Sequence, residues 1–391
     1  VFLREGTYHE TVSVTASGTA DAPITFQPYR DEQVTISGTV VVSDWSGPDS
    51  QGIYTAQVPE TIDVKDENIA VFVNGQMMHR AREPEIGDHN DPYSQQWLET
   101  PMIKGMAVNI QAANGQYLKA EGRGGGDVRA NADVSGSWEE FYLIDTNGGG
   151  LKSGDQVGFL TRDHKHYLVA ENGGSPGGAG DILAANRTEF SFWEKFTIDS
   201  ATSKEEIGSG DTITLRAAKD GYLSADQCGG GVVNANSASI GNCDKFTITI
   251  HPGSLVLFDE NAVDFDNSTN TWAGSYIWGP FGANWSLNMA KISASEPGKL
   301  TLGAKDEWWD SWGWSHGYAA ILGGLAALDS AGEWHYEAGS GGAGGTLYYK
   351  PPGGQDPQNV TVEIRPRMWA VDAAGSYLVF RNMDIFAGQM R

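Results

Sequence analysis

Three stretches in the middle of the chain repeat one another: GQYLKAE from Gly115, KHYLVAE from Lys165 and DGYLSAD from Asp220. Each repeat closes on a second shared motif: SWEEFYLID from Ser137, FWEKFTID from Phe192 and NCDKFTIT from Asn242. A unit of this size cannot bury its apolar face alone, so we expect the three units to share one core. The aromatic residues that recur in register should be buried there, around one pseudo-threefold axis: Tyr117, Tyr167, Tyr222, Phe141, Phe196 and Phe246.

Composition predicts an all-β protein. Glycine accounts for 51 of the 391 residues, and this abundance favours short strands joined by tight turns. No long stretch has the periodicity of an amphipathic helix. The length is sufficient for two or three domains.

The formal net charge of −24 predicts which partners the protein avoids. So acidic a surface repels nucleic acid and anionic membranes, so we expect neither as a partner. No apolar run reaches membrane-spanning length. The acidic surface suits a secreted, extracellular protein.

The chain has two cysteines, Cys228 and Cys243, both in the third repeat. A disulfide between them is plausible outside the cell, and two buried free thiols are the alternative. Two sulfurs alone do not make a metal site, and the histidines show no metal-ligand spacing, so we predict no bound metal from these residues.

The outer segments resemble a known family. The opening runs FLREGTYHETV from Phe2, SGTADAPITFQPY from Ser17 and EQVTISG from Glu32, and it resembles the first rungs of secreted right-handed parallel β-helix proteins. This group includes polysaccharide lyases and glycoside hydrolases. The resemblance continues in VFVNGQMMHRAREP (71–84), in the Gly-Glu-Trp hairpin of LAALDSAGEWHYEAG (325–339) and in TLYYKPPGGQDP (346–357).

The repeated middle segment resembles a fascin-like β-trefoil and interrupts the β-helix pattern. We therefore expect a partial right-handed parallel β-helix with an inserted trefoil. The expected limits are 1–105 for the N-terminal rungs, 106–250 for the trefoil and 251–391 for a hairpin region and resumed rungs. Residues 1–60 and 360–391 should then pair in one parallel stack.

A cluster of tryptophans is the leading candidate for sugar binding. Trp308, Trp309, Trp312 and Trp314 fall within seven residues and are followed by His316. Indoles stack on the C–H faces of sugars, although large aromatic side chains also pack β-structure. Because Asp306, Glu307 and Asp310 interrupt the cluster, we expect it to line an open groove.

Catalytic residues are harder to predict. A glycoside hydrolase needs two placed carboxyl groups, and Glu333 of the Gly-Glu-Trp motif is one weak candidate, with a hairpin-anchoring role as the alternative. A lyase needs a base and a cation that neutralises a uronate, either Ca²⁺ or a basic side chain. The arginines near the motifs are candidates, and bridges between rungs are their alternative role: Arg80, Arg82, Arg365 and Arg367. The resemblance implies that the site lies on later rungs, beyond Arg391.

Three carboxylates of the trefoil recur in register, namely Glu121, Glu171 and Asp226. They are candidates for sugar binding in three equivalent pockets, and turn capping is the alternative. At the two chain ends we expect open apolar rungs that a further chain segment or second chain completes: Phe2, Leu3, Val379, Phe380, Ile385 and Phe386.

The resemblance to β-helix proteins implies a secreted polysaccharide-degrading enzyme, hydrolase or lyase, whose trefoil binds carbohydrate or braces the body. The alternative is a non-catalytic extracellular protein that binds glycans or forms part of a matrix.

Overall fold

The computed structural model describes residues 1–65, 68–84, 102–147, 150–259, 271–279, 288–305, 319–339 and 344–391. Across these ranges the chain forms β-strands and a few short 3₁₀ turns, with no α-helix, which confirms the all-β prediction. The contacts divide the chain into two compact units. One unit joins Val1–Arg82 to Gly323–Arg391, and the other is Glu83–Leu322.

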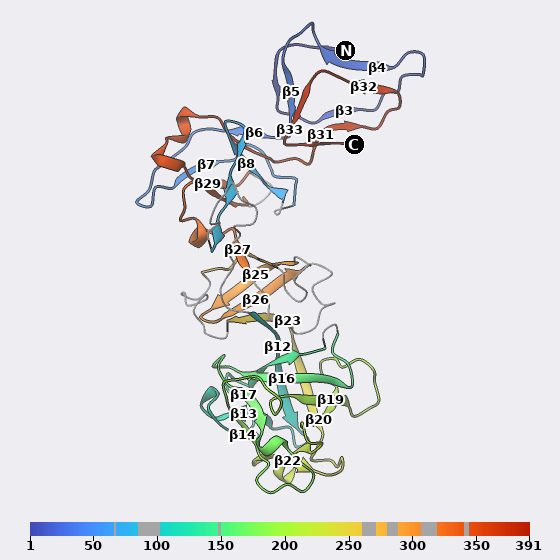
Figure 1. The fold of residues 1–391 in the computed structure, drawn as a ribbon, viewed down its shortest axis with the longest axis vertical. Helices are drawn as coiled ribbons and strands as arrows, with labels where there is room; N and C mark the ends of the chain where they lie inside the picture. Colours follow the sequence, from blue (N-terminus) through green and yellow to red (C-terminus); the bar gives the residue numbers. More distant parts are fainter. Residues whose placement is uncertain are drawn as a thin grey trace. The chain divides into compact units, whose positions relative to one another are not determined.

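The first unit contains three small parallel sheets of three strands each. They have the orders β1-β4-β32, β2-β5-β33 and β3-β31-β34, and all six of their strand pairings are parallel. Figure 1 shows that strands from both ends of the sequence lie side by side in these sheets. The strand bounds are Phe2–Leu3, Gly6–Tyr8, Val12–Val14, Ile24–Pro28, Val34–Ser37, Trp369–Ala373, Leu378–Phe380, Asp384–Phe386 and Gln389–Met390 for β1–β5 and β31–β34.

These sheets stack the chain into three successive coils. Strands β1, β2 and β3 make the first coil, and β4 and β5 begin the second. After β5 the chain leaves the parallel sheets, and it returns at β31, which completes the second coil. Strands β32, β33 and β34 form the third coil. Ile36, Ala370 and Val371 form one buried cluster, so this core joins residues that are more than 300 positions apart.

The parallel stack is smaller than the sequence predicts. Pairing between the two ends is parallel only for residues 1–37 with 369–391, because β6 (Val40–Val42) pairs antiparallel with β30 (Val362–Ile364). Most other pairings in the described residues are also antiparallel. The expectation that 1–60 and 360–391 form one parallel stack is therefore wrong beyond these limits.

Two antiparallel-rich sheets form the rest of the first unit. One has the order β6-β30-β8-β9 and the other β10-β28-β29-β7. Their apolar faces share a buried core that includes Trp45, Val71, Trp334, Leu347 and Tyr349. The strand bounds not yet given are Tyr54–Gln57, Val71–Val73, Gln76–Met77, His79–Arg80, Glu333–Glu337 and Thr346–Lys350 for β7, β8, β9, β10, β28 and β29.

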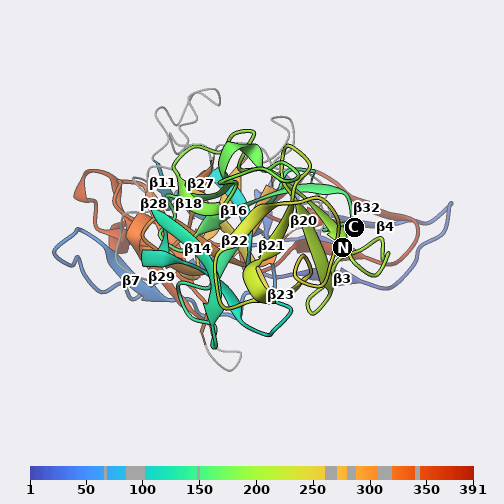
Figure 2. The ribbon, with the colours of Figure 1, turned by 90° about the horizontal axis from the view of Figure 1, so that it is seen from below.

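The second unit is built around a closed six-stranded barrel. Strands β12, β15, β16, β19, β20 and β23 pair in a ring, each antiparallel to the next. Three hairpins, β13–β14, β17–β18 and β21–β22, complete the repeats, and Figure 2 shows strands of all three at the front. This is the arrangement of a β-trefoil. The bounds of β12–β23 are Met102–Ala112, Tyr117–Ala120, Gly126–Ala132, Glu140–Asp145, Asp155–Thr161, Tyr167–Ala170, Leu183–Arg187, Phe196–Ser200, Thr212–Arg216, Tyr222–Ala225, Val233–Ser237 and Phe246–Asp259.

The trefoil core confirms half of the predicted aromatic set. Phe141, Phe196 and Phe246 are at most 1% exposed and belong to one buried cluster. The prediction that the three tyrosines share this core is wrong. Tyr117 and Tyr222 are only partly buried, and Tyr167 packs in a different buried cluster with Tyr142. Adjacent residues of a strand point to opposite faces, so the leucine that follows each tyrosine fills the core instead: Leu118, Leu168 and Leu223.

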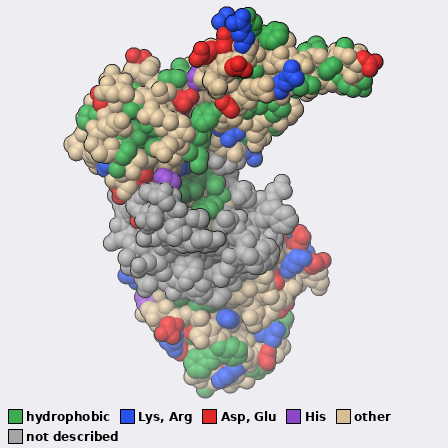
Figure 3. All heavy atoms as spheres, turned by 45° about the horizontal axis from the view of Figure 1, so that its top comes forward, with side chains coloured by type: hydrophobic (Ala, Val, Ile, Leu, Met, Phe, Trp, Pro, Cys, Tyr) green, Lys and Arg blue, Asp and Glu red, His purple; other side chains and the backbone are tan. Residues whose placement is uncertain are grey.

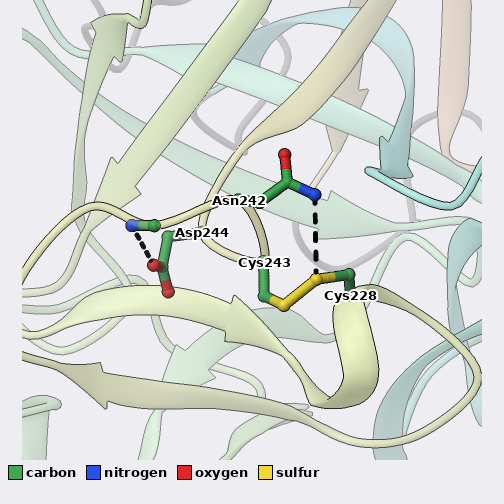
Figure 4. Close-up of a disulfide and its surroundings, with 5 residues drawn as sticks. Cys228, Asn242, Cys243 and Asp244 are labelled. Carbon is green, nitrogen blue, oxygen red and sulfur yellow. Dashed lines mark hydrogen bonds between the residues drawn. A yellow bond between two sulfur atoms is a disulfide. The ribbon is translucent and has the colours of Figure 1, made fainter.

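The two cysteines form a disulfide in the third repeat, which the sequence left open. Figure 4 shows that the bond joins the turn after β21 to the loop before β23. The Asn242 amide approaches the Cys228 sulfur at 3.9 Å, and Asp244 accepts the backbone N–H of Gly241 at 2.6 Å. The loop is therefore held by one covalent and two polar contacts.

Strands β12 and β23 run on beyond the barrel, where β23 pairs with β26 (Lys299–Lys305) of a further antiparallel sheet. That sheet also contains β24 (Tyr276–Gly279), β25 (Asn288–Glu296) and β27 (Ala320–Leu322). Strands β24–β27 thus belong to the same compact unit as the trefoil, whereas the sequence predicts them in the C-terminal segment. The predicted limits of 1–105, 106–250 and 251–391 stay a prediction.

Apolar side chains at the outer strands of the parallel stack are exposed. Phe2 is 64% exposed, and Val379 and Ile385 are also exposed. Leu3, Phe380 and Phe386 are half-buried, and Phe380 stacks on Phe26 with ring centroids 4.7 Å apart. The predicted exposure is therefore confirmed for three of the six residues.

Candidate functional site

The outer face of the sheet β10-β28-β29-β7 gathers polar and titratable side chains. Alternation in β28 sends Trp334 and Tyr336 into the core, so the residues between them point to the opposite face. The register places His335 and Thr55 on either side of Tyr348, and Glu337 and Gln57 on either side of Thr346. Strands β28 and β29 and the distant strand β7 thus form one polar surface.

Three of these side chains form a connected group. The backbone N–H of Gly324 donates to Nδ1 of His335 at 2.9 Å. Nδ1 therefore acts as an acceptor, and Nε2, the ring nitrogen left to carry a proton, lies 3.8 Å from Oε1 of Glu337. The Tyr348 hydroxyl donates to Oε2 of Glu337 at 3.0 Å. Burial, together with this carboxylate, raises the pKa of Tyr348, so the phenol stays protonated and the carboxylate remains the acceptor.

A pocket of about 290 Å³ opens beside Tyr348. This volume is close to the lower end of the range for small-molecule sites, roughly 300–1,000 Å³. The walls combine a phenol ring, apolar groups, hydroxyls and a carboxylate. They come from Ser46, Gly47, Pro48, Asp49, Gln51, Ile53, Thr55, Leu325 and Tyr348.

The loop that forms one wall of the pocket is held by Asp49. Its carboxylate accepts the backbone N–H groups of Ile53 and Gln51 at 2.9 and 2.8 Å. These hydrogen bonds lower the pKa of Asp49, because they stabilise the charged form. At Gly47, where φ is +130°, a Cβ atom would lie 2.9 Å from the Ile53 carbonyl oxygen. Glycine is therefore required at this position of the loop.

Glu333 lies on the same sheet but is not open to a ligand. Its side chain is buried, with the residue 2% exposed. One carboxylate oxygen accepts the backbone N–H of Arg82 at 3.1 Å, and the other accepts that of Ser330 at 3.2 Å. This geometry favours the hairpin-anchoring role over the catalytic one.

Replacing Glu333 with alanine is expected to lower the free energy of unfolding by about 1–3 kcal/mol, because the buried N–H of Arg82 and the partly buried N–H of Ser330 lose their acceptor. Chemical denaturation measures the change. Glu337→Ala is the matched control on the same strand, and it should cost less because Glu337 is exposed. Equal losses in the two variants would contradict the anchoring role.

The predicted arginine candidates are engaged in structural contacts. The guanidinium of Arg80 lies 5.7 Å from the ring of Trp334, and Arg82 is buried. Arg365 donates to the carbonyl of Arg367 at 3.4 Å. Arg367 donates to the Thr39 carbonyl at 3.0 Å and pairs with Glu60. These contacts favour the alternative of bridging neighbouring segments.

The predicted tryptophan site lies outside the described residues. This applies to Trp308, Trp309, Trp312, Trp314 and His316, and to the neighbouring carboxylates Asp306, Glu307 and Asp310. The groove predicted there stays a prediction.

The three register-related carboxylates of the trefoil each begin a 3₁₀ turn. Glu121 pairs with Lys119 at 3.2 Å. Glu171 pairs with Arg187 at 2.8 Å and accepts a hydrogen bond from Asn186 at 3.1 Å. The contacts of the two glutamates favour turn bracing. Sugar binding by these residues and by Asp226 stays a prediction.

Sequence reasoning missed His335, Glu337 and Tyr348. The signal was present in EWHYE and TLYYK, where apolar and polar residues alternate with the period of a strand. The pairing of these two strands with β7, which brings the loop 46–53 to the same face, required the tertiary structure.

Three further findings concern the described residues. No group of three or more His, Cys, Asp or Glu side chains in the described ranges is arranged to hold a metal ion. In the same ranges no helix is both long and apolar enough to span a membrane. On the face drawn in Figure 3, acidic and basic side chains are interspersed.

Comparison with known proteins yields weak similarities. No protein-family model matches the chain. The uncharacterised protein YwoF of Bacillus subtilis (strain 168) is 56% identical over 43 residues, which are 11% of this chain and 9% of that protein. Only a small part of the curated relative is therefore covered.

Three solved structures illustrate the structural similarities. A glycoside hydrolase has 12% identity and a TM-score of 0.43, covering 99% of this chain and 43% of its own. The designed threefold-symmetric protein ThreeFoil has 14% identity and a TM-score of 0.30, covering 37% of this chain and 97% of its own. An exo-β-1,3-galactanase from Clostridium thermocellum has 12% identity and a TM-score of 0.30, covering 37% and 30%. At these values the similarities assign no activity to this chain, which spans less than half of the glycoside hydrolase.

Proposed function

We propose that the chain is part of a secreted polysaccharide-degrading enzyme, in which the three stacked coils are rungs of a right-handed parallel β-helix and the trefoil is an inserted domain. The observation that carries the functional proposal is the pocket beside Tyr348. A phenol ring offers a surface for the C–H face of a sugar, and the surrounding carboxylate and hydroxyl groups suit sugar hydroxyls.

Three further observations support this proposal. The parallel pairing of β1–β5 with β31–β34 agrees with the resemblance of the end segments to β-helix proteins. The disulfide suits an oxidising, extracellular environment. The acidic net charge of −24 is unsuited to nucleic acid.

A polysaccharide panel tests the enzymatic proposal. The full chain is incubated with neutral and acidic polysaccharides, and new reducing ends are measured together with ultraviolet absorbance of unsaturated products. Reducing ends alone identify a hydrolase, and both signals identify a lyase, because β-elimination leaves a double bond in the sugar. Neither signal with any polysaccharide would contradict an activity residing in this chain.

One observation favours the non-catalytic alternative. Glu333, the carboxylate that the sequence singles out, has both oxygens occupied by backbone N–H groups. A chain that binds a polysaccharide in the panel without degrading it would support this second function, in which the same pocket holds a glycan.

Replacing Tyr348 with alanine is expected to weaken glycan binding about tenfold or more, because the stacking surface of the pocket is lost. Isothermal titration with the polysaccharide identified by the panel measures the change. Tyr348→Phe keeps the ring and removes only the hydrogen bond to Glu337, so it should retain most of the affinity. Loss of binding in both variants, or in neither, would contradict the stacking role.

A further inference from the structure

The second shared motif has tryptophan in two trefoil repeats, Trp138 and Trp193, and the fold does not require an indole at this position. The backbone carbonyls of Trp138, Trp193 and Cys243 accept the N–H groups of Ala120, Ala170 and Ala225 at 2.9, 3.2 and 2.9 Å. The next residue of each motif braces the preceding turn through a carboxylate-to-N–H hydrogen bond: Glu139, Glu194 and Asp244. The third repeat keeps both contacts with cysteine in place of tryptophan, so the backbone contacts do not depend on an indole.

The indole of the second repeat lies in an environment suited to a ligand. Trp193 is 36% exposed and Phe192 beside it is 61% exposed. Gly173 allows the indole to lie directly against the backbone, since a Cβ atom there would be 2.9 Å from the ring nitrogen. The ammonium group of Lys219 lies 5.6 Å from the centroid of the ring.

The charge of Lys219 distinguishes this position from its counterpart in the first repeat. Lys119 lies 5.7 Å from the ring of Trp138, but Glu121 pairs with it at 3.2 Å. Lys219 is exposed and forms no salt bridge with any residue that the structure describes. The carboxylate of Asp181 interacts with the charge of Lys219 but lies beyond salt-bridge distance. In a chain whose net charge is −24, an exposed ammonium group without a salt bridge beside an exposed aromatic pair is a local exception.

We propose that Phe192, Trp193 and Lys219 form a binding site for an acidic sugar unit of a polyuronate. The aromatic rings would stack on the C–H face of the sugar, and the ammonium group would pair with its carboxylate. The inference rests on the proposed carbohydrate function but uses a site in the second unit, separate from the residues that line the Tyr348 pocket. The inference also gives the trefoil a single site of this kind. In the first repeat Lys119 is paired with Glu121, and in the third repeat a disulfide-bonded cysteine stands in place of the tryptophan.

The test is affinity electrophoresis of the full chain in gels that contain polygalacturonate or its fully methyl-esterified form. The two polymers share a backbone and differ in charge. Trp193→Ala should weaken binding to polygalacturonate about tenfold, which is the effect of losing one stacking contact. Lys219→Met keeps the apolar stem and should weaken binding to polygalacturonate about five- to tenfold, with no change for the ester. Trp138→Ala is the matched control and should bind like the wild type.

Several results would overturn the inference. Unchanged binding of polygalacturonate by Lys219→Met would exclude the acidic ligand, and an equal loss in Trp138→Ala would exclude a single site. Failure of the wild type to bind polygalacturonate would also overturn it. If Trp193→Ala does not fold, Trp193→Phe should show intermediate binding, and Lys219→Met still decides the role of charge.

The same experiment separates this inference from the proposed function. Degradation in the polysaccharide panel and the effect of Tyr348→Ala depend on the first unit. If these persist while Trp193→Ala binds normally, only the trefoil site is refuted. If the panel is negative but Trp193→Ala and Lys219→Met lose polygalacturonate binding, the trefoil site stands without the enzymatic function.

Discussion

Replacing Phe196 with alanine is expected to lower the free energy of unfolding by about 3–5 kcal/mol, the usual cost of removing a large buried aromatic side chain. Phe196 is 1% exposed and packs in the shared trefoil core. Phe141 and Phe246 occupy the equivalent positions in the other repeats. Their alanine variants should therefore lose similar amounts, which denaturant unfolding monitored by tryptophan fluorescence will measure.

The tyrosines supply the control for this prediction. Tyr117 occupies the register position at which the sequence predicts a core residue, yet it is only partly buried. Leu118 fills the core instead, so Leu118→Ala should cost about 2–5 kcal/mol and Tyr117→Ala clearly less. A larger loss for Tyr117→Ala than for Leu118→Ala would contradict the assignment of the leucines to the core.

The second large effect is expected from acid pH and depends on His164. This side chain lies beside a buried polar cluster in which the hydroxyl of Tyr142 accepts hydrogen bonds from Arg162 and Lys299, at 2.5 and 3.1 Å. Glu296 pairs with Lys299 at 2.9 Å and with Arg162 at 3.1 Å. The cluster therefore joins the trefoil barrel to the turn between β25 and β26 within the second unit.

Burial, and next the positive charges of Lys299 and Arg162, lower the pKa of His164 to about 4 from its ordinary 6.5. The unfolded chain consequently binds a proton at a pH where the folded chain does not. The stability of the second unit should be complete above about pH 6.5 and fall by about 3 kcal/mol as the pH drops to 4. The pKa of Glu296 is lowered as well: burial acts to raise it, but the ion pairs with Lys299 and Arg162 have the larger effect. The stability of the second unit therefore declines further when the Glu296 carboxylate is protonated.

Thermal or denaturant unfolding between pH 7 and pH 4 measures this dependence. His164→Gln retains a polar side chain without a proton to gain, so its stability should fall less steeply between pH 6.5 and 4 than that of the wild type. His166→Gln, two residues away in the same loop, is the matched control. Parallel curves for wild type and His164→Gln would contradict the role of His164.

The sequence by itself determined the features that repeat or alternate locally. The register of the three repeats predicted a shared core and placed Phe141, Phe196 and Phe246 correctly, because three small units must bury one apolar surface together. Glycine content and short alternating runs predicted an all-β chain. Neighbouring tyrosine and leucine residues are both apolar enough for a core, however, and only the twist and pairing of the strands decided that Leu118, Leu168 and Leu223 point inward.

The tertiary structure alone decided the contacts between distant segments. Parallel pairing of residues 1–37 with 369–391 followed the resemblance of the two ends, but the antiparallel pairing of β6 with β30 limited its extent. The candidate site combines Thr55, His335 and Tyr348, which share a face only because β28, β29 and β7 pair in one register. Register between distant strands depends on the summed pairing and packing of the whole sheet, and no local pattern in a single sequence specifies it.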